Sequence, residues 1–346
     1  AARLARRVLQ HAPLDAEALS TFAVAQSRLG HAQAGQQAML VAGRLGWRDL
    51  VVQISLLRAN LMSAQAEPAV LHLDAILRRQ DPVAPGLLQI TEIIAHDPTA
   101  RRMLVARLAL NPNWREPLFT FLSKDARPDA LAVYGQLLRM LVQTGGPPSG
   151  SETGPYLQTL VNQGRYADAR AAWRDLGKVQ TASLVYNGDF AHTPGNTPFD
   201  WSVDDSEGWS AQVEQSPAPE AGMALRVRYD GVSTAPPVQE MVLLAPGQYQ
   251  LSFQQMDEVG DPGQVLNWTV KCAGSGQVID QQQPSTSAES GSWRQAGGVF
   301  SVPQSGCDAQ WVGITAQPGE RPETSVRWYR RITIAPLMGA GAAGRH

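Results

Sequence analysis

The hydrophobic period of this chain changes close to residue 180, and that change limits the folds it can adopt. Before it, apolar residues recur at the three- and four-residue spacing of an α-helix. From Leu184 onward apolar and polar residues alternate, as in "GQYQLSFQQM", where Tyr249, Leu251 and Phe253 share one face. We therefore expect an all-α domain over residues 1–180, a β-domain over 183–336 and a flexible tail over 337–346.

The charge distribution places the boundary in the same region. Residues 1–178 hold 20 Lys and Arg against 14 Asp and Glu, a net charge of +6, whereas residues 179–346 hold 9 against 17, a net charge of −8. Neither value demands a nucleic acid or an anionic membrane as a partner. We therefore expect no nucleic-acid partner. No apolar run approaches the ~20 residues that cross a bilayer, so we also expect no membrane span.

A three-residue motif repeats in the first half at an interval of 34 residues. Most copies have a small residue, a bulky one four positions later and an apolar one three further on, so all three lie along one face of a helix. The small residue would let a partner helix approach closely. The copies are Ala1, Ala5 and Val8; Gly35, Met39 and Ala42; Ala69, Leu73 and Ile76; then, after length drift, Ala130, Tyr134 and Leu137; and Ala169, Trp173 and Leu176.

Paired helices with this period resemble the tetratricopeptide repeat. The closest copy is "YLQTLVNQGRYADARAAWRDLG", where Gly164, Tyr166, Ala169 and Trp173 fall where that motif has Gly, Tyr, Ala and a bulky residue. Residues 84–127 match poorly, which predicts irregular helix pairs. The resemblance implies a solenoid that binds protein partners. In this register residues 1–12 are the second helix of a repeat, so we expect that an upstream part was removed.

Two further features of the first half bear on its surface and loops. Arg101, Arg102 and Arg107 line either a groove for an anionic partner or a solvated helix face. The stretch "QTGGPPSGSETGPY", Gln143 to Tyr156, is rich in turn-forming residues and predicts a long loop between helix pairs.

The second half contains about eight short alternating segments separated by turn signals such as Pro246-Gly247. Antiparallel strands of this length and spacing are typical of a β-sandwich or jelly roll. Alternation places Trp268 in the core, and Trp201 follows Phe199 at the same parity and is expected there too.

The order of four segments resembles the carbohydrate-binding modules of the galactose-binding-like jelly-roll superfamily over residues 183–336. These are Asn187-Gly188-Asp189-Phe190 followed by Trp201, then "PGQYQLSFQ", "SWRQAGGVFSVPQSGCDAQWVGI" and "VRWYRRITIAP". The resemblance implies that Asn187 to Phe190 begins the first strand and that the domain binds glycans. The same fold also serves other ligands.

A structural calcium in many members of that superfamily uses an acidic residue of the closing strand. Here that strand carries Arg330 and Arg331, which leaves a calcium site at Asp189 weakly supported. We therefore expect no metal and no cofactor.

Glycan sites combine flat aromatic faces with surrounding amides and charged groups. The aromatic residues not committed to the core by alternation are Trp209, Trp293, Trp311 and Tyr329, and Gln250 and Gln254 lie on the strand face opposite Leu251. Each has an alternative interpretation, since aromatic residues also pack under loops and outer sheet faces are commonly solvated.

The two cysteines, Cys272 and Cys307, lack the C-x-x-C spacing of a metal or redox site. They are either buried free thiols or a disulfide that closes a loop of ~35 residues and indicates an oxidising compartment.

The sequence offers little for catalysis. Asp204, Asp205 and Glu207 lie in a turn-rich segment and are expected to be solvated, and no two of the six histidines have metal-ligand spacing on a helix. Phosphate-binding and nucleophile-elbow motifs are absent from the sequence. We expect a chain that is not an enzyme.

These observations favour a bacterial scaffold or adaptor, periplasmic or in the cell envelope, that serves assembly or export of exopolysaccharide or envelope polysaccharide. The solenoid would hold proteins and the sandwich a glycan. Two alternatives stay open. A pure protein scaffold predicts a large apolar interface between the halves and no exposed aromatic cleft. An accessory region of a carbohydrate-active enzyme requires two carboxylates facing each other across a cleft.

Overall fold

The computed structural model describes residues 1–125, 127–177, 179, 181–203, 205–217, 222–231, 238–259, 266–282, 291–316 and 324–337. The chain divides into two compact units, Ala1–Glu152 (unit 1) and Thr153–His346 (unit 2). The change from helix to strand comes after residue 177, so the last helices belong to the same compact unit as the strands. Residues 338–346 of the predicted tail lie outside the described residues.

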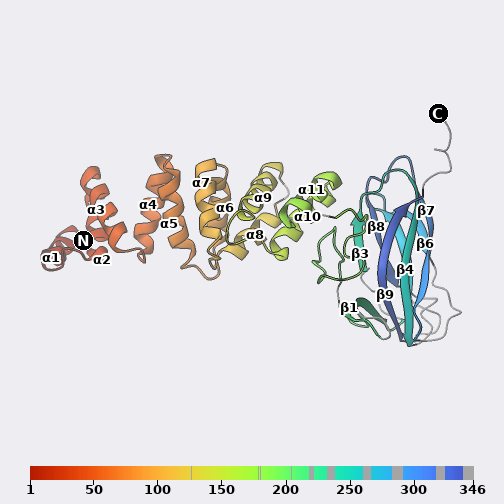
Figure 1. The fold of residues 1–346 in the computed structure, drawn as a ribbon. Helices are drawn as coiled ribbons and strands as arrows, with labels where there is room; N and C mark the ends of the chain where they lie inside the picture. Colours follow the sequence, from red (N-terminus) through yellow and green to blue (C-terminus); the bar gives the residue numbers. More distant parts are fainter. Residues whose placement is uncertain are drawn as a thin grey trace. The chain divides into compact units, whose positions relative to one another are not determined.

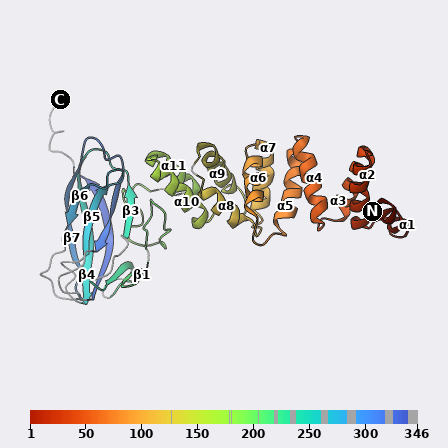
Figure 2. The same cartoon turned by 180° about the vertical axis from the view of Figure 1, so that it is seen from behind.

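Unit 1 is built of successive helices joined by short turns, as expected for helical repeats (Figures 1 and 2). Aspartates begin several of them: the Asp15 carboxylate accepts from the Ala18 amide at 2.8 Å, which satisfies a donor that a helix start leaves unpaired. The helices are α1 (Ala2–His11), α2 (Ala16–Arg28), α3 (Ala32–Leu45), α4 (Leu50–Met62), α5 (Ala66–Leu77), α6 (Pro85–Ala95), α7 (Pro98–Leu108), α8 (Arg115–Ser123), α9 (Pro128–Leu141) and the start of α10 (Gly150–Asn162).

The repeat motif occupies helix faces that pack closely. At Gly35 in α3 a Cβ atom would lie 2.9 Å from the carbonyl oxygen of Ala23 in α2, so only glycine permits this approach. In α5 the motif residues Ala69, Leu73 and Ile76 are fully buried. The middle of the unit departs from simple pairing, because α5 packs against α7 and α6 against α8.

The loop predicted over Gln143–Tyr156 is shorter than expected, because α10 begins at Gly150 and Pro155 lies inside the helix. The helix is fixed by Glu152, whose two carboxylate oxygens accept from Nε and Nη2 of Arg115 at 2.6 and 2.7 Å. Tyr134 Oη also donates to the Glu152 carbonyl at 2.6 Å. Tertiary contacts thus override the local turn preference of glycine and proline here.

Unit 2 carries helix α11 (Tyr166–Gly177) and a sandwich of two antiparallel sheets, which confirms the predicted fold class. In the described residues the five-stranded sheet has the order β1-β2-β9-β4-β7 and the four-stranded sheet the order β3-β8-β5-β6. The strands are β1 (Trp209–Gln215), β2 (Met223–Tyr229), β3 (Val238–Val242), β4 (Gly247–Val259), β5 (Leu266–Cys272), β6 (Val278–Gln282), β7 (Arg294–Val302), β8 (Gln310–Ala316) and β9 (Ser325–Pro336).

The core lies between the two sheets and follows the alternation of the sequence. Leu251 and Phe253 of β4 are buried there, as predicted. Trp268 stacks on Phe253 with ring centroids 4.7 Å apart, and Trp201 meets Trp268 edge-on at 6.1 Å. The predicted core positions of both tryptophans are therefore confirmed.

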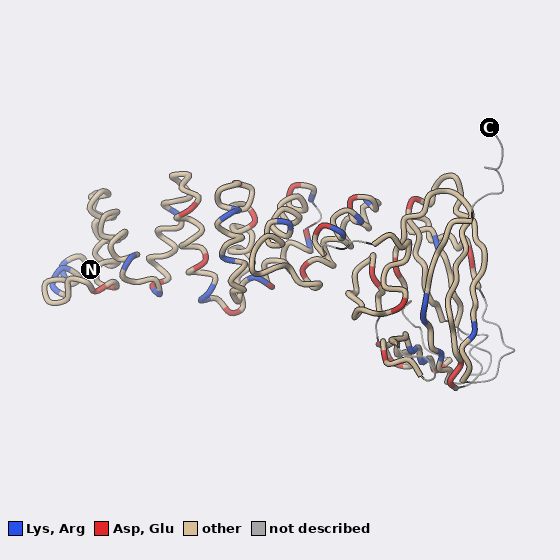
Figure 3. The backbone as a smooth tube through the Cα atoms, in the orientation of Figure 1, with Lys and Arg blue, Asp and Glu red and all other residues tan. Residues whose placement is uncertain are grey.

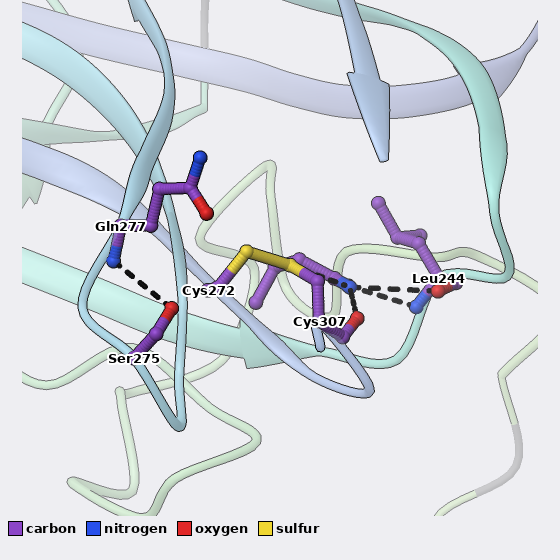
Figure 4. The surroundings of a disulfide bond; sticks show 6 residues. Leu244, Cys272, Ser275, Gln277 and Cys307 are labelled. Atoms are coloured by element: carbon purple, nitrogen blue, oxygen red, sulfur yellow. Dashed lines mark hydrogen bonds between the residues drawn. A yellow bond between two sulfur atoms is a disulfide. The ribbon is translucent and has the colours of Figure 1, made fainter. Parts of the chain in front are cut away.

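A disulfide joins Cys272, the last residue of β5, to Cys307 in the connection before β8 (Figure 4). The two residues are 35 positions apart in sequence. Both are buried in the core, at 1 % and 5 % exposure, and nearby Leu244 donates its amide to Gln310 Oε1 at 2.9 Å. Of the two alternatives for the cysteines, the structure shows the disulfide.

Asn187 to Phe190 form a turn, so the prediction that they begin the first strand is wrong. Asn187 has a φ of 50°, and its side chain bonds both the amide and the carbonyl of His192 at 3.0 and 2.7 Å. Gly188 lies against β9, where the Ile332 amide donates to its carbonyl at 2.8 Å. A side chain that bonds its own backbone in this way favours a turn over a strand.

Candidate functional site

The outer face of the five-stranded sheet is the face turned away from the core, and it carries both aromatic and polar side chains. A β-bulge in β9 sets which residues reach it. Ser252 of β4 pairs with Thr333, but Gln254 pairs with Arg330, so β9 holds one extra residue between them. Arg331 at this bulge has a φ of 50°. The irregularity keeps Ile332 in the core while Trp328 and Arg330 both face outward.

Trp328 forms the apolar base of this face. It is 5 % exposed and packs with Ala224 and Met256. Its indole Nε1 donates to Glu258 Oε2 at 2.5 Å. Arg226 lies over the ring, with its guanidinium carbon 5.7 Å from the ring centroid, a cation–π arrangement that holds the ring in place.

Glu258 is an ionised anchor on this face. Arg226 donates to its two oxygens at 3.0 and 3.1 Å. The bond from Arg226 is the main cause that lowers the pKa of the Glu258 carboxyl, and Glu258 in turn raises the pKa of Arg226. A carboxyl held ionised in this way cannot donate a proton as a general acid near neutral pH.

Trp293 is the more accessible aromatic side chain of the face and is half-buried. Arg330 stacks on it, with the guanidinium carbon 4.0 Å from the ring centroid. The same guanidinium donates from Nε to Gln254 Oε1 at 2.9 Å and from Nη1 to Ser216 Oγ at 3.2 Å. Three partners thus fix the orientation of Arg330 behind the indole, and the ring is preorganised before any ligand arrives.

A row of amides and hydroxyls continues from this point along the strands. Gln250 and Ser252 of β4 are partly exposed, and Gln295 of β7 donates to Ser252 Oγ at 3.3 Å. Thr333 of β9, beside Ser252, is exposed. Such groups can donate to and accept from hydroxyl groups of a ligand. The face therefore combines one apolar ring with several uncharged hydrogen-bonding groups.

The structure brings together only part of the predicted site. Trp293, Gln250 and Gln254 lie on this outer face, whereas Trp311 lies on the four-stranded sheet, opposite Met241 and Lys271.

The prediction that Trp209 and Tyr329 belong to the binding site is wrong. Both lie in the core and are 2 % and 0 % exposed. A ring buried on both faces cannot stack on a ligand. Trp328, Arg226 and Glu258 were missed. The signal for Trp328 was its place next to the core residue Tyr329 in a strand, which assigns it to the opposite face.

Acidic residues at two places in the chain are candidates for binding a cation. Asp189 is exposed, and its carboxylate accepts from the Ala191 amide at 3.4 Å. Within the part of the chain that is described, one set can bring three ligand atoms within 4.8 Å of one another: Glu92, His96 and Asp129.

The guanidinium of Arg127 lies within that set. It is 3.7 Å from Glu92 and 3.4 Å from Asp129. Because this positive charge already lies against two of the three candidate ligands, the residues fit an ion-pair cluster better than a metal centre.

A group of buried charged residues lies where α11 packs against the sandwich. Glu240 of β3 is fully buried and accepts from the Tyr186 amide at 2.8 Å. Burial raises the pKa of Glu240 well above its usual range. The hydrogen bond from the Tyr186 amide and the charge of Arg170 lower this pKa, but by less. Arg170 of α11 lies 5.0 and 5.3 Å from the rings of Trp173 and Phe199. These residues fasten α11 to the sandwich.

No family model matches the chain, and no curated protein matches it. Solved structures similar to unit 2 include a carbohydrate-binding module described as CBM4, with 13 % identity over 44 % of this chain and 99 % of that one, at a TM-score of 0.34. The family 22 carbohydrate-binding module of Clostridium thermocellum Xyn10B has 15 % sequence identity over 45 % of this chain and 97 % of that one, at a TM-score of 0.32. An arabinose-bound α-L-arabinofuranosidase shares 14 % over 45 % of this chain and 26 % of that one, at 0.34.

In the described residues, no helix combines the length and apolar character that crossing a bilayer requires.

Proposed function

We propose that this chain is a non-enzymatic binding protein whose sandwich holds a polysaccharide on the outer face of the five-stranded sheet. The observation that carries the proposal is the Trp293–Arg330 pair: a half-buried indole that stacks on a guanidinium held by Gln254 and Ser216. Sugar rings have apolar faces that pack on an indole and hydroxyl groups at their edges that bond amides. This geometry suits a chain of sugars lying across the strands.

Two acidic residues of the sandwich, Glu258 and Glu240, suit a binding role better than acid catalysis on the outer face. Glu258 is held ionised by Arg226, and Glu240 is sealed in the interior. Glycoside hydrolysis needs an acid and a second carboxylate on either side of one bond. Neither residue offers a protonated carboxyl to the outer face.

The whole chain would then act as a scaffold in the bacterial envelope that assists assembly or export of a polysaccharide. The helical repeats of unit 1, which we assign to the tetratricopeptide type, would hold protein partners. A location in the periplasm or envelope is supported by the Cys272–Cys307 disulfide, since such bonds persist in oxidising compartments.

Affinity electrophoresis and calorimetry against a panel of polysaccharides test this proposal. Trp293→Ala should abolish retardation by the bound polymer. Trp311→Ala is the matched control, because it removes a partly exposed tryptophan from the other sheet and should leave binding intact. Circular dichroism checks that both variants fold. Loss of binding in the Trp311 variant alone would place the site on the four-stranded sheet and refute the proposed location. A wild-type chain that binds none of the polymers would refute the glycan role.

The second candidate is a protein scaffold whose sandwich only braces the repeats. It is favoured by the aromatic and charged seam at α11, where Trp173 packs edge-on against Tyr186 at 5.0 Å. This candidate expects no retardation by any polysaccharide and a strong loss of stability when Trp173 is truncated. It gives no reason for the ordered Trp293–Arg330 stack.

A further inference from the structure

A pocket in unit 1 has a composition that the glycan proposal does not use. It has a volume of about 560 Å³ and lies between the α3–α4 turn, helix α5 and helix α7. Its charged lining consists of four arginines and one aspartate. Lys and Arg positions recur along the helices of this unit (Figure 3). Pockets of this size are typical of ligand sites.

Internal pairing accounts for only one of the four arginines. The Asp74 carboxylate accepts from Arg78 Nε at 2.8 Å and from the buried Trp114 Nε1 at 2.8 Å. Among the described residues, the guanidinium groups of Arg48, Arg79 and Arg107 have no hydrogen-bond or ion-pair partner. The pocket therefore carries an uncompensated positive charge from three groups that come from three separate elements.

An exposed tryptophan forms the apolar wall of the same pocket. Trp47 is 48 % exposed, and one of its faces stacks on His72 with ring centroids 5.6 Å apart and planes at 21°. His72 Nδ1 lies 2.6 Å from Gln53 Oε1, so the supporting ring is itself held in place. Another hollow of similar size in this unit, at α2, has Glu17, Asp49 and Arg28 as its charged lining and carries no such excess of positive charge.

These features select the kind of partner. A guanidinium presents a planar fork that bonds a carboxylate through two parallel contacts, and three such forks beside an indole suit alternating acidic and apolar side chains. We propose that this pocket docks an acidic segment of a partner protein, with at least two carboxylates flanking an apolar side chain that packs on Trp47. The inference rests on the proposed role of unit 1 as a protein-binding solenoid, and it is independent of glycan binding.

The test uses the full chain and a fluorescein-labelled acidic peptide of alternating Glu and Leu, with anisotropy as the readout. The matching Gln and Leu peptide reports the contribution of charge. The pocket variant Arg48→Glu/Arg79→Glu/Arg107→Glu should weaken binding of the acidic peptide by at least about tenfold, since each lost charge-assisted bond is worth at least that factor. Trp47→Ala should weaken both peptides.

A matched control separates the pocket from general charge. Arg7, Arg58 and Arg139 are exposed arginines outside this pocket, and changing all three to Glu alters the net charge by the same amount. This control should keep the wild-type affinity within about twofold, because solvent screens distant charges. The milder set Arg48→Gln/Arg79→Gln/Arg107→Gln replaces the Glu set if the latter unfolds.

Three results would overturn the inference. Equal losses in the pocket and control variants would show diffuse attraction, and a wild-type chain that ignores the acidic peptide would show that the pocket has no such use. Self-association of the wild type that the pocket variant abolishes would make the occupant a second copy of this chain. Trp293→Ala should leave peptide binding unchanged, so failure of the glycan site and failure of this pocket are told apart.

Discussion

Removal of the disulfide gives the sharpest test of how unit 2 is stabilised. Cys272 and Cys307 close a loop of 35 residues, and the chain-entropy relation assigns a loop of that length about 4 kcal/mol at 25 °C. Because that entropy is lost from the unfolded chain, Cys272→Ala/Cys307→Ala should lower the free energy of unfolding of unit 2 by about 3–4 kcal/mol.

Urea unfolding followed by tryptophan fluorescence measures this change. Seven of the nine tryptophans lie within Thr153–His346, so the signal reports mainly on unit 2. With a slope of about 2 kcal/mol per molar urea, the midpoint should fall by roughly 2 M.

Reduced wild-type protein is the matched control, since it keeps both sulfur atoms but loses the constraint. Its free energy of unfolding should agree with that of the double variant within about 1 kcal/mol. A loss below about 1 kcal/mol in both samples would refute the loop-entropy reasoning. Two titratable thiols in the denatured, unreduced chain would refute the bond itself.

Three further predictions concern buried groups. Arg115→Met leaves the carboxylate of Glu152 buried without its partner and should cost about 3–5 kcal/mol in urea unfolding. Gly188→Ala places a Cβ 2.0 Å from the Ile332 carbonyl oxygen, so it should lower the thermal midpoint by several degrees or more, about 4 °C per kcal/mol lost. Burial raises the pKa of Glu240 in the folded chain above the unfolded value of 4.5, so folding takes up a proton and the stability from this carboxyl is lost as pH rises above that value. Glu240→Gln removes this titration, so its stability relative to wild type should rise as the pH increases above 4.5. A difference in stability that does not change with pH would contradict the burial argument.

The alternation of apolar and polar residues was enough to predict which side chains of these strands lie between the two sheets. Leu251, Phe253 and Trp268 occupy the core because side chains on a strand point to opposite faces whatever the strand pairs with. The helical repeat was predictable because residues three and four positions apart share one helix face. Gly35 takes the position of close approach, where a Cβ atom would clash.

The candidate site was only partly readable. Alternation placed Gln254 on the outer face and left Trp293 uncommitted to the core. Nothing local shows that Arg330 contacts both of them. That arrangement depends on the bulge at Arg331, which shifts β9 against β4 by one residue.

The sequence by itself determined the two kinds of secondary structure, the change between them after the last helix, and the inward-facing side chains of β4 and β5. Only the tertiary structure decided that Trp293, Arg330 and Gln254 meet on one outer face, that Asn187 starts a turn, and that three arginines from separate helices and turns share one pocket. The physical reason is range: a periodic pattern is set by neighbours a few residues away, whereas pairing register, bulges and convergent charges depend on segments that meet only when the chain folds.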